Sequence, residues 1–161
     1  MSAAIADSGP EKKFIDGLIK PANLSHFDAW IKSTATRFYE IDYAWKKGEH
    51  PKRGKFSPDF FIKAGSLILV VEIKDDTELR EPSEENRKKN EYAVEHFKRV
   101  NHHLEEAGSP IRYQFNFLTP KNIDTFFQCL REARIAAFRS ELDVVLADEE
   151  SNNGRKNNDS D

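Results

Sequence analysis

The feature that most constrains the fold is an unbroken apolar run from Leu67 to Val71, followed directly by Glu72-Ile73-Lys74. Five successive apolar residues are typical of a strand covered on both faces, because a half-exposed strand would alternate with polar residues. The run therefore predicts a central strand from Leu67 to Lys74. It is far too short to cross a bilayer.

Two kinds of pattern predict the elements around this strand. Apolar residues spaced three or four apart, with capping, Thr-Pro or Gly signals at the ends, indicate helices, and short β-branched or aromatic runs indicate strands. The expected helices begin near Ser8, at Ser83 and at Thr119-Pro120, and the expected strands are Arg37 to Trp45, Phe56 to Lys63 and Tyr113 to Leu118. The order α-β-β-β-α-β-α predicts an α/β sandwich around a mixed central sheet.

Chain length, cysteine content and the N-terminal sequence indicate the kind of protein and the compartment to expect. With 161 residues the chain has the size of one domain and can bury most of the surface that its unfolded form exposes. The only cysteine, Cys129, allows neither a disulfide framework nor a CxxC metal site, which favours a reducing compartment. The N-terminus lacks the basic-then-apolar pattern of a signal peptide. We therefore expect a soluble cytoplasmic protein without a membrane partner.

Charge is distributed unevenly along the chain. The net charge is −3, but residues 141–161 contain seven acids and two bases and so contribute −5. These residues have the composition of an acidic, largely disordered tail. The domain in front of them, residues 1–140, then carries a net charge of +2, which permits a nucleic-acid partner.

A basic segment lies inside that domain, from Trp45 to Lys55, where five lysines and arginines face a single acid, Glu49. We expect a loop that contacts the phosphates of a nucleic acid, although a soluble turn would have the same composition. The candidates for these contacts are the cations in its second half: Lys52, Arg53 and Lys55.

Asp59, Glu72 and Lys74 are the residues expected to carry chemistry. Glu72 and Lys74 are two apart on one strand, so their side chains project from the same face. If Ala64-Gly65 forms a two-residue turn, Asp59 pairs with Val70 and becomes the diagonal neighbour of Glu72, at roughly 7–8 Å between backbones. This inference depends on the register, since a slip of one residue would move Asp59 to the other face.

These residue types suit a magnesium site. Mg²⁺ takes hard oxygen ligands in octahedral geometry, usually one or two carboxylates together with waters and phosphate oxygens of the substrate. Asp59 and Glu72 provide the carboxylates, and the backbone carbonyl of Ile73 is a candidate third ligand. Lys74 would orient the attacking water, or deprotonate it if the pKa of its ammonium were lowered.

Two segments resemble the motif of PD-(D/E)xK nucleases. Ser57-Pro58-Asp59-Phe60-Phe61 contributes Pro-Asp, and Val70-Val71-Glu72-Ile73-Lys74 contributes Glu-x-Lys, with thirteen residues from Asp59 to Glu72. Flanking segments narrow the resemblance to the C-terminal endonuclease domain of type III restriction enzyme R subunits and related helicase-nucleases. They are Trp30-Ile31-Lys32, Ile41-Asp42-Tyr43-Ala44-Trp45 and Lys89-Asn90-Glu91-Tyr92-Ala93-Val94-Glu95-His96-Phe97, and the whole resemblance covers about residues 8–135.

This resemblance implies a restriction-endonuclease-like α/β/α sandwich of order αβββαβα in a restriction or phage-defence system. It implies cleavage of DNA with Mg²⁺, or Mn²⁺ as a substitute, leaving a 5′-phosphate and a 3′-hydroxyl. It also implies that Glu11, the acid of the first helix, approaches the metal. The chain contains no GxxxxGK[ST] loop, so any helicase or translocase module belongs to another part of the protein or to another polypeptide. The oligomeric state stays open.

Some of these residues have a second interpretation. Glu11 follows Ser8 by three residues, where it would cap the helix without any metal. Lys89 extends the buried stripe of its helix toward the strand ends, where it either contacts the substrate or is a solvated lysine. Glu40 and Asp42 share a face of the first expected strand and are the reserve acids if Glu11 is only a cap.

Two other functions fit the same pattern. A catalytically silent nuclease fold would bind DNA or a protein partner, but such a module gains little from two carboxylates placed where phosphates must approach. A DNA repair or junction-resolving nuclease would share the core motif. The sequence does not distinguish duplex, branched and single-stranded substrates.

Overall fold

A computed structural model describes residues 9–33, 38–47 and 49–156 of the chain. In chain order its elements are α1 (Gly9–Leu18), α2 (Pro21–Leu24), β1 (Ala29–Lys32), β2 (Ile41–Lys47), β3 (His50–Phe56), β4 (Phe60–Ala64), β5 (Leu67–Ile73), the 3-10 helix η1 (Asp76–Leu79), α3 (Glu84–Glu106), β6 (Arg112–Leu118), α4 (Pro120–Arg131), the 3-10 helix η2 (Ile135–Ala137) and α5 (Glu141–Lys156). None of the described helices combines the length and the hydropathy needed to cross a membrane.

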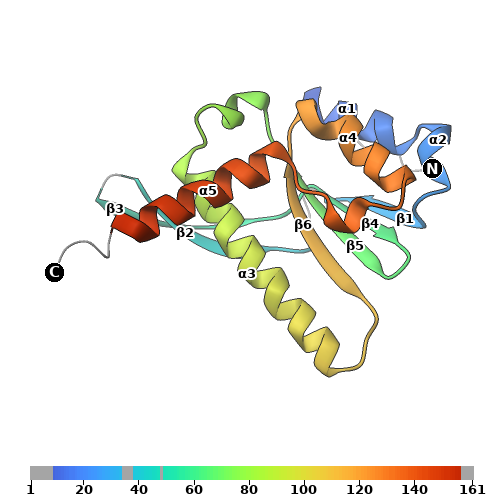
Figure 1. Ribbon diagram of the computed structural model, residues 1–161. Helices are drawn as coiled ribbons and strands as arrows, with labels where there is room; N and C mark the ends of the chain where they lie inside the picture. The colour runs from blue at the N-terminus through green and yellow to red at the C-terminus, as the bar shows by residue number, and fades with distance from the viewer. Residues whose placement is uncertain (1–8, 34–37, 48, 157–161) are drawn as a thin grey trace.

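The main sheet has four strands in the order β1-β4-β5-β6 (Figure 1). Strands β1, β4 and β5 are antiparallel, whereas β5 and β6 are parallel, so the sheet is mixed as expected. Helix α3 provides the long crossover that a parallel pair requires. The fold is therefore an α/β fold, but five strands precede α3 in the described chain where the sequence suggested three.

Strand β5 is covered on both faces, which confirms the prediction from its apolar run. Leu69 and Val71 belong to the core that contains α1 and α4, while Val70 belongs to a second core formed with α3, β2 and β3. All three side chains are completely buried. On the first side α1 approaches α4 so closely that a Cβ atom on Gly17 would collide with the ring of Phe127.

The hairpin of β4 and β5 turns one residue later than expected. Ala64 pairs with Leu67 and Phe60 with Val71, so the turn is Gly65-Ser66 rather than Ala64-Gly65. Gly65 takes a positive φ of 62°, which glycine adopts without steric cost at the first position of such a turn. The shift changes every pair by two positions, and because the side-chain period is also two, the expected faces are preserved.

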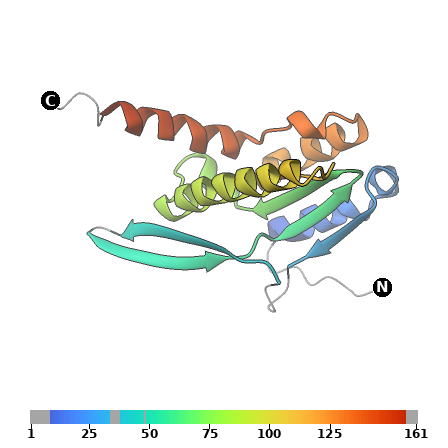
Figure 2. The same ribbon diagram turned by 90° about the horizontal axis from the view of Figure 1, so that it is seen from below.

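The segment expected to be a basic loop instead forms regular structure. Residues 50–56 are β3, and they pair with β2 from Ile41↔Phe56 to Lys47↔His50 in a separate two-stranded sheet. The predicted strand from Phe56 to Lys63 is divided at Ser57-Pro58-Asp59, where a proline cannot donate to a ladder. We call the pair β2–β3 the ribbon. It projects from the main sheet on the side away from β1 and α2 (Figure 2).

The prediction of a largely disordered tail from residue 141 is wrong over most of its length. Residues 141–156 form α5, and Leu142 and Leu146, four residues apart, are buried against Phe117 of β6. Asp143 accepts hydrogen bonds from the backbone N–H of Phe117 at 2.9 Å and from the side chain of Asn116 at 2.8 Å. The domain boundary at residue 140 is therefore not supported, and residues 157–161 lie outside the described part.

The other helices agree with the sequence. Helix α3 is capped by Ser83, whose hydroxyl accepts a hydrogen bond from the backbone N–H of Asn86, and it ends before Gly108, which has a φ of 71°. Helix α4 begins at Pro120 directly after β6. Helix α1 begins by Gly9, while its expected cap, Ser8, lies outside the described residues.

Candidate metal centre

The β4–β5 hairpin brings Asp59 and Glu72 together at one end of the sheet. Asp59 lies immediately before β4, and continuing the register by one residue places it opposite Glu72, closer than the diagonal position expected from the sequence. Its Oδ2 accepts a hydrogen bond of 2.7 Å from the backbone N–H of Ile73. This bond fixes the carboxylate beside the last residues of β5.

Glu72 is a buried carboxylate whose two oxygens have different surroundings. The residue is 6% exposed, and its Oε1 accepts a bond of 2.9 Å from Nζ of Lys74. Its Oε2 is buried without a hydrogen-bond partner in the described structure. Such an oxygen is unfavourable in a protein interior unless something compensates its charge. A divalent cation with a preference for oxygen ligands would do so, and the donor set therefore fits Mg²⁺.

Both carboxyl groups resist ionisation. Burial, followed by the charge of Glu72, raises the pKa of Asp59 to about 8, and the hydrogen bond from Ile73 only partly opposes this. Burial likewise raises the pKa of Glu72, against the stabilising charge of Lys74. A bound cation would reverse this balance by favouring the two ionised forms.

Lys74 follows β5 directly, and its backbone N–H donates to the carbonyl of Leu118 at the end of β6. Burial disfavours its ammonium, but Glu72 and Asp59 outweigh that effect and hold the pKa of Lys74 above its ordinary value. A general base would need a lowered pKa. In the metal-free site Lys74 therefore carries a positive charge, which suits a group that orients water.

Glu11 reaches the same region from α1 but is engaged by another residue. It is 9% exposed, and its Oε2 lies 3.3 Å from Nζ of Lys32 on β1. Its charge contributes to the raised pKa of Asp59, so the two acids are electrostatic neighbours. Within the described chain, however, no three His, Cys, Asp or Glu side chains converge closely enough to hold a metal together. The expected ligand role of Glu11 stays a prediction.

Lys89 lies beside the carboxylates, in the direction that its place on the helical stripe suggested. Its ammonium is 3.2 Å from Oε1 of Glu85 and 5.2 Å from the centre of the Tyr43 ring. The hydroxyl of Tyr43 donates to the same Glu85 oxygen at 2.6 Å. Lys89 is also close enough to stabilise the charged form of Glu72 and so to oppose the rise in its pKa.

The structure separates the remaining candidates from the carboxylate pair. Lys52, Arg53 and Lys55 lie on β3 and are exposed. Lys55 forms ion pairs across the ribbon with Glu40 at 3.7 Å and Asp42 at 3.8 Å, which accounts for the two reserve acids. Sequence reasoning missed Lys32, Tyr43 and Glu85 as neighbours of the site. The local sequence patterns at these three residues do not reveal their tertiary partners.

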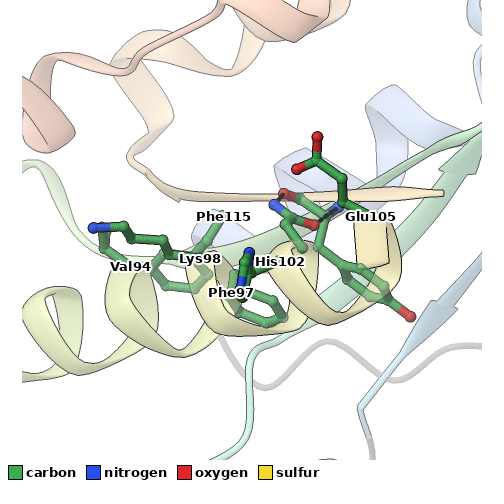
Figure 3. A pocket seen from close by; sticks show the side chains of 8 residues that line it. Val94, Phe97, Lys98, His102, Glu105 and Phe115 are labelled. Atoms are coloured by element: carbon green, nitrogen blue, oxygen red, sulfur yellow. Dashed lines mark hydrogen bonds between the residues drawn. The ribbon is translucent and has the colours of Figure 1, made fainter. Parts of the chain in front are cut away.

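A groove of about 570 Å³ between α3 and β6 contains none of these residues (Figure 3). The side chain of Asn101 there donates to the backbone carbonyl of Tyr113 at 2.8 Å and accepts from its N–H at 2.7 Å. These bonds satisfy the outward backbone groups of Tyr113 on an edge strand and protect that edge from pairing with other chains.

Comparisons of the chain with models of protein families, with characterised proteins and with solved structures find no match.

Proposed function

We propose that the chain is an Mg²⁺-dependent DNA endonuclease of the PD-(D/E)xK type, with Asp59 and Glu72 as metal ligands. The observation that carries this proposal is the buried Oε2 of Glu72, which has no hydrogen-bond partner in the described structure. The charge of this carboxylate also helps to raise the pKa of Asp59 beside it. Two neighbouring buried acids destabilise a protein unless a proton or a cation accompanies them. Their cost is most simply explained by a function that requires the cation.

The residues divide the work of phosphodiester hydrolysis among them. Mg²⁺, when bound, neutralises charge on the phosphate and lowers the pKa of water. Asp59 and Glu72 hold the cation, and the carbonyl of Ile73 is the candidate third oxygen. Lys74 keeps its ammonium against Glu72 Oε1, where it orients the attacking water and stabilises negative charge that develops on the phosphate.

We also propose that the fold is a variant of the restriction-endonuclease-like α/β/α sandwich. Three features support this: Glu72 lies on β5 and Asp59 directly before its antiparallel neighbour β4, the next strand is parallel to β5, and helices cover both faces of the sheet. The ribbon is then an insertion into the order αβββαβα, in which β1, β4 and β5 are the three strands before α3, and α2 and α5 are further additions. A role in restriction or phage defence, with a helicase module elsewhere, rests on the resemblance of the sequence motifs alone.

Cleavage of supercoiled plasmid tests the proposal. The wild-type protein should nick or linearise the plasmid with Mg²⁺ or Mn²⁺ and should be inactive in EDTA. Glu72→Gln and Lys74→Ala should abolish cleavage, whereas Lys63→Ala, which removes an exposed lysine from β4, should retain it. A wild-type protein that binds DNA but never cleaves it would favour the catalytically silent alternative.

A further inference from the structure

We propose that the ribbon inserts into the major groove of duplex DNA, so that the substrate of this nuclease is double-stranded. The proposal deepens the proposed function, on which the choice of DNA as ligand rests. The ribbon, residues 41–47 and 50–56, is held at its root by Ile41 and Phe56, which are 3% and 6% exposed. Its far end projects beyond the main sheet (Figure 2).

The two faces of the ribbon differ in character. The inner face packs toward α3 and contains the pairs Tyr43↔Gly54 and Trp45↔Lys52. The outer face contains the pairs Asp42↔Lys55, Ala44↔Arg53 and Lys46↔Pro51. Lys46 and Arg53 are exposed there, while Lys55 is shared between two acids. The outer face therefore presents positive charge and no aromatic ring.

The aromatic rings of Tyr43 and Trp45 lie on the inner face of the ribbon and not on its charged outer face. Tyr43 and Trp45 stack on each other, with ring centres 4.9 Å apart and planes 14° apart. Tyr43 is 6% exposed and donates its hydroxyl to Glu85. Proteins that bind single strands without sequence preference combine a basic groove with exposed aromatic platforms. The outer face of the ribbon has the positive charge but no exposed aromatic ring on which bases could stack. This favours binding of a duplex over binding of a single strand.

The dimensions of the ribbon favour the major groove. Two paired strands lie about 4.8 Å apart, and their side chains widen the element beyond that. The major groove of B-DNA, about 12 Å wide, admits a two-stranded ribbon without deformation, whereas the minor groove, about 6 Å wide, would first have to be widened at a cost in free energy. Exposed cations on the ribbon would then contact the phosphates that border the groove.

The root of the ribbon is braced next to the carboxylates. Lys89 of α3 lies over the ring of Tyr43 at 5.2 Å and over that of Phe56 at 5.8 Å, and it interacts electrostatically with Glu72. One lysine thus connects the ribbon to the candidate metal centre. DNA held by the ribbon would lie at a fixed position relative to Asp59 and Glu72.

Fluorescence anisotropy of the full chain in EDTA tests the proposal apart from cleavage. The probes are a labelled random-sequence duplex and one of its strands alone. The test variant is Lys46→Ala/Arg53→Ala, and the control is Lys12→Ala/Lys63→Ala, which removes the same charge from α1 and β4. Each phosphate contact contributes about 0.9 to the slope of log K against log salt. The test variant should therefore flatten the slope by about 1.8 and weaken duplex binding roughly 60-fold at about 0.1 M salt.

The expected results are preference for the duplex, loss of binding in the test variant only, and displacement of the protein by the major-groove dye methyl green. Equal binding of the single strand, wild-type affinity of the test variant, equal loss in the control, or displacement by the minor-groove ligand netropsin alone would overturn the proposal. A protein that cleaves plasmid but gives any of these results retains its proposed function. If the protein binds duplex DNA through the ribbon but never cleaves it, the nuclease proposal is refuted and the proposed role of the ribbon in DNA binding is retained.

Discussion

Asp59→Asn should stabilise the metal-free protein and should lose most of the stabilisation that a bound metal gives to wild type. The folded state raises the pKa of Asp59 from its ordinary 3.8 to about 8, so at pH 7 the folded protein keeps a proton that the unfolded chain has lost. The contribution of Asp59 to the free energy of unfolding is therefore fully present below about pH 4. It decreases between about pH 4 and pH 8, the pKa values of the unfolded and folded states. At about 1.4 kcal/mol per pH unit, the loss by pH 7 reaches up to about 4 kcal/mol. Asparagine has no ionisable proton, so the Asp59→Asn variant does not lose this stability as the pH rises.

Urea denaturation between pH 4 and pH 8 measures this difference. In EDTA, the free energy of unfolding of Asp59→Asn should exceed that of wild type at pH 7 to 8, and the two should converge near pH 4. With Mn²⁺ at about one hundred times its Kd, wild type should gain about 2.7 kcal/mol and Asp59→Asn should gain little. Asp16→Asn, at an exposed position of α1, is the matched control and should follow wild type throughout. The reasoning is refuted if Asp59→Asn has no advantage in EDTA at pH 8, or if Mn²⁺ stabilises it as much as wild type.

Three further results follow from the same structure. Cleavage should be supported by Mg²⁺ and Mn²⁺ but not by Ca²⁺, whose looser coordination positions the water poorly; equal plasmid nicking with Ca²⁺ would contradict this. Gly17→Ala should destabilise the protein by about 1–3 kcal/mol, because the added methyl group meets the ring of Phe127; thermal unfolding at an unchanged Tm would show that α1 and α4 can separate freely. Leu146→Ala should cost about 2–5 kcal/mol in urea denaturation, since Leu146 is buried against β6, and an unchanged midpoint would mean that α5 is not part of the domain.

The elements that could be predicted were those whose signals are local. The apolar run of β5 predicted cover on two faces, and Ser83 and Gly108 delimited α3 through capping and a positive φ. The proximity of Asp59 and Glu72 was predictable for a related reason. Although the hairpin register was displaced, it moved by two positions, and a strand keeps its faces under such a shift. Asp59 and Glu72 therefore stayed on one side of the sheet.

The elements that were missed depend on partners distant in the sequence. Strand β3 contains Pro51, Gly54 and several cations, a composition that is unfavourable for a strand, and it forms because β2 supplies the ladder. Gly54 leaves room for the ring of Tyr43, which a Cβ atom would approach to 3.0 Å. Strand β1 has only four residues and acquires its structure from pairing with β4.

Helix α5 and the outer parts of the site were hidden for the same reason. Its two buried leucines lie in an acidic sequence, and Asp143 gains its partners only when β6 is folded beside it. The pairs Glu11–Lys32 and Tyr43–Glu85 likewise depend on how α1 and α3 dock on the strands. Periodicity identifies the face on which a charged residue lies but not the charge that it meets.

Calorimetric titration of Mn²⁺, paired with plasmid cleavage, tests the central claim most directly. Wild type should bind Mn²⁺ and cleave. Asp59→Ala and Glu72→Ala should lose both properties, because each removes a carboxylate ligand. Lys74→Ala should keep the metal and lose cleavage, since an ammonium is not a ligand and its removal reduces the positive charge near the cation. Wild-type cleavage by any of the three variants would contradict the site, and a Lys74→Ala protein that no longer binds Mn²⁺ would contradict the roles assigned within it.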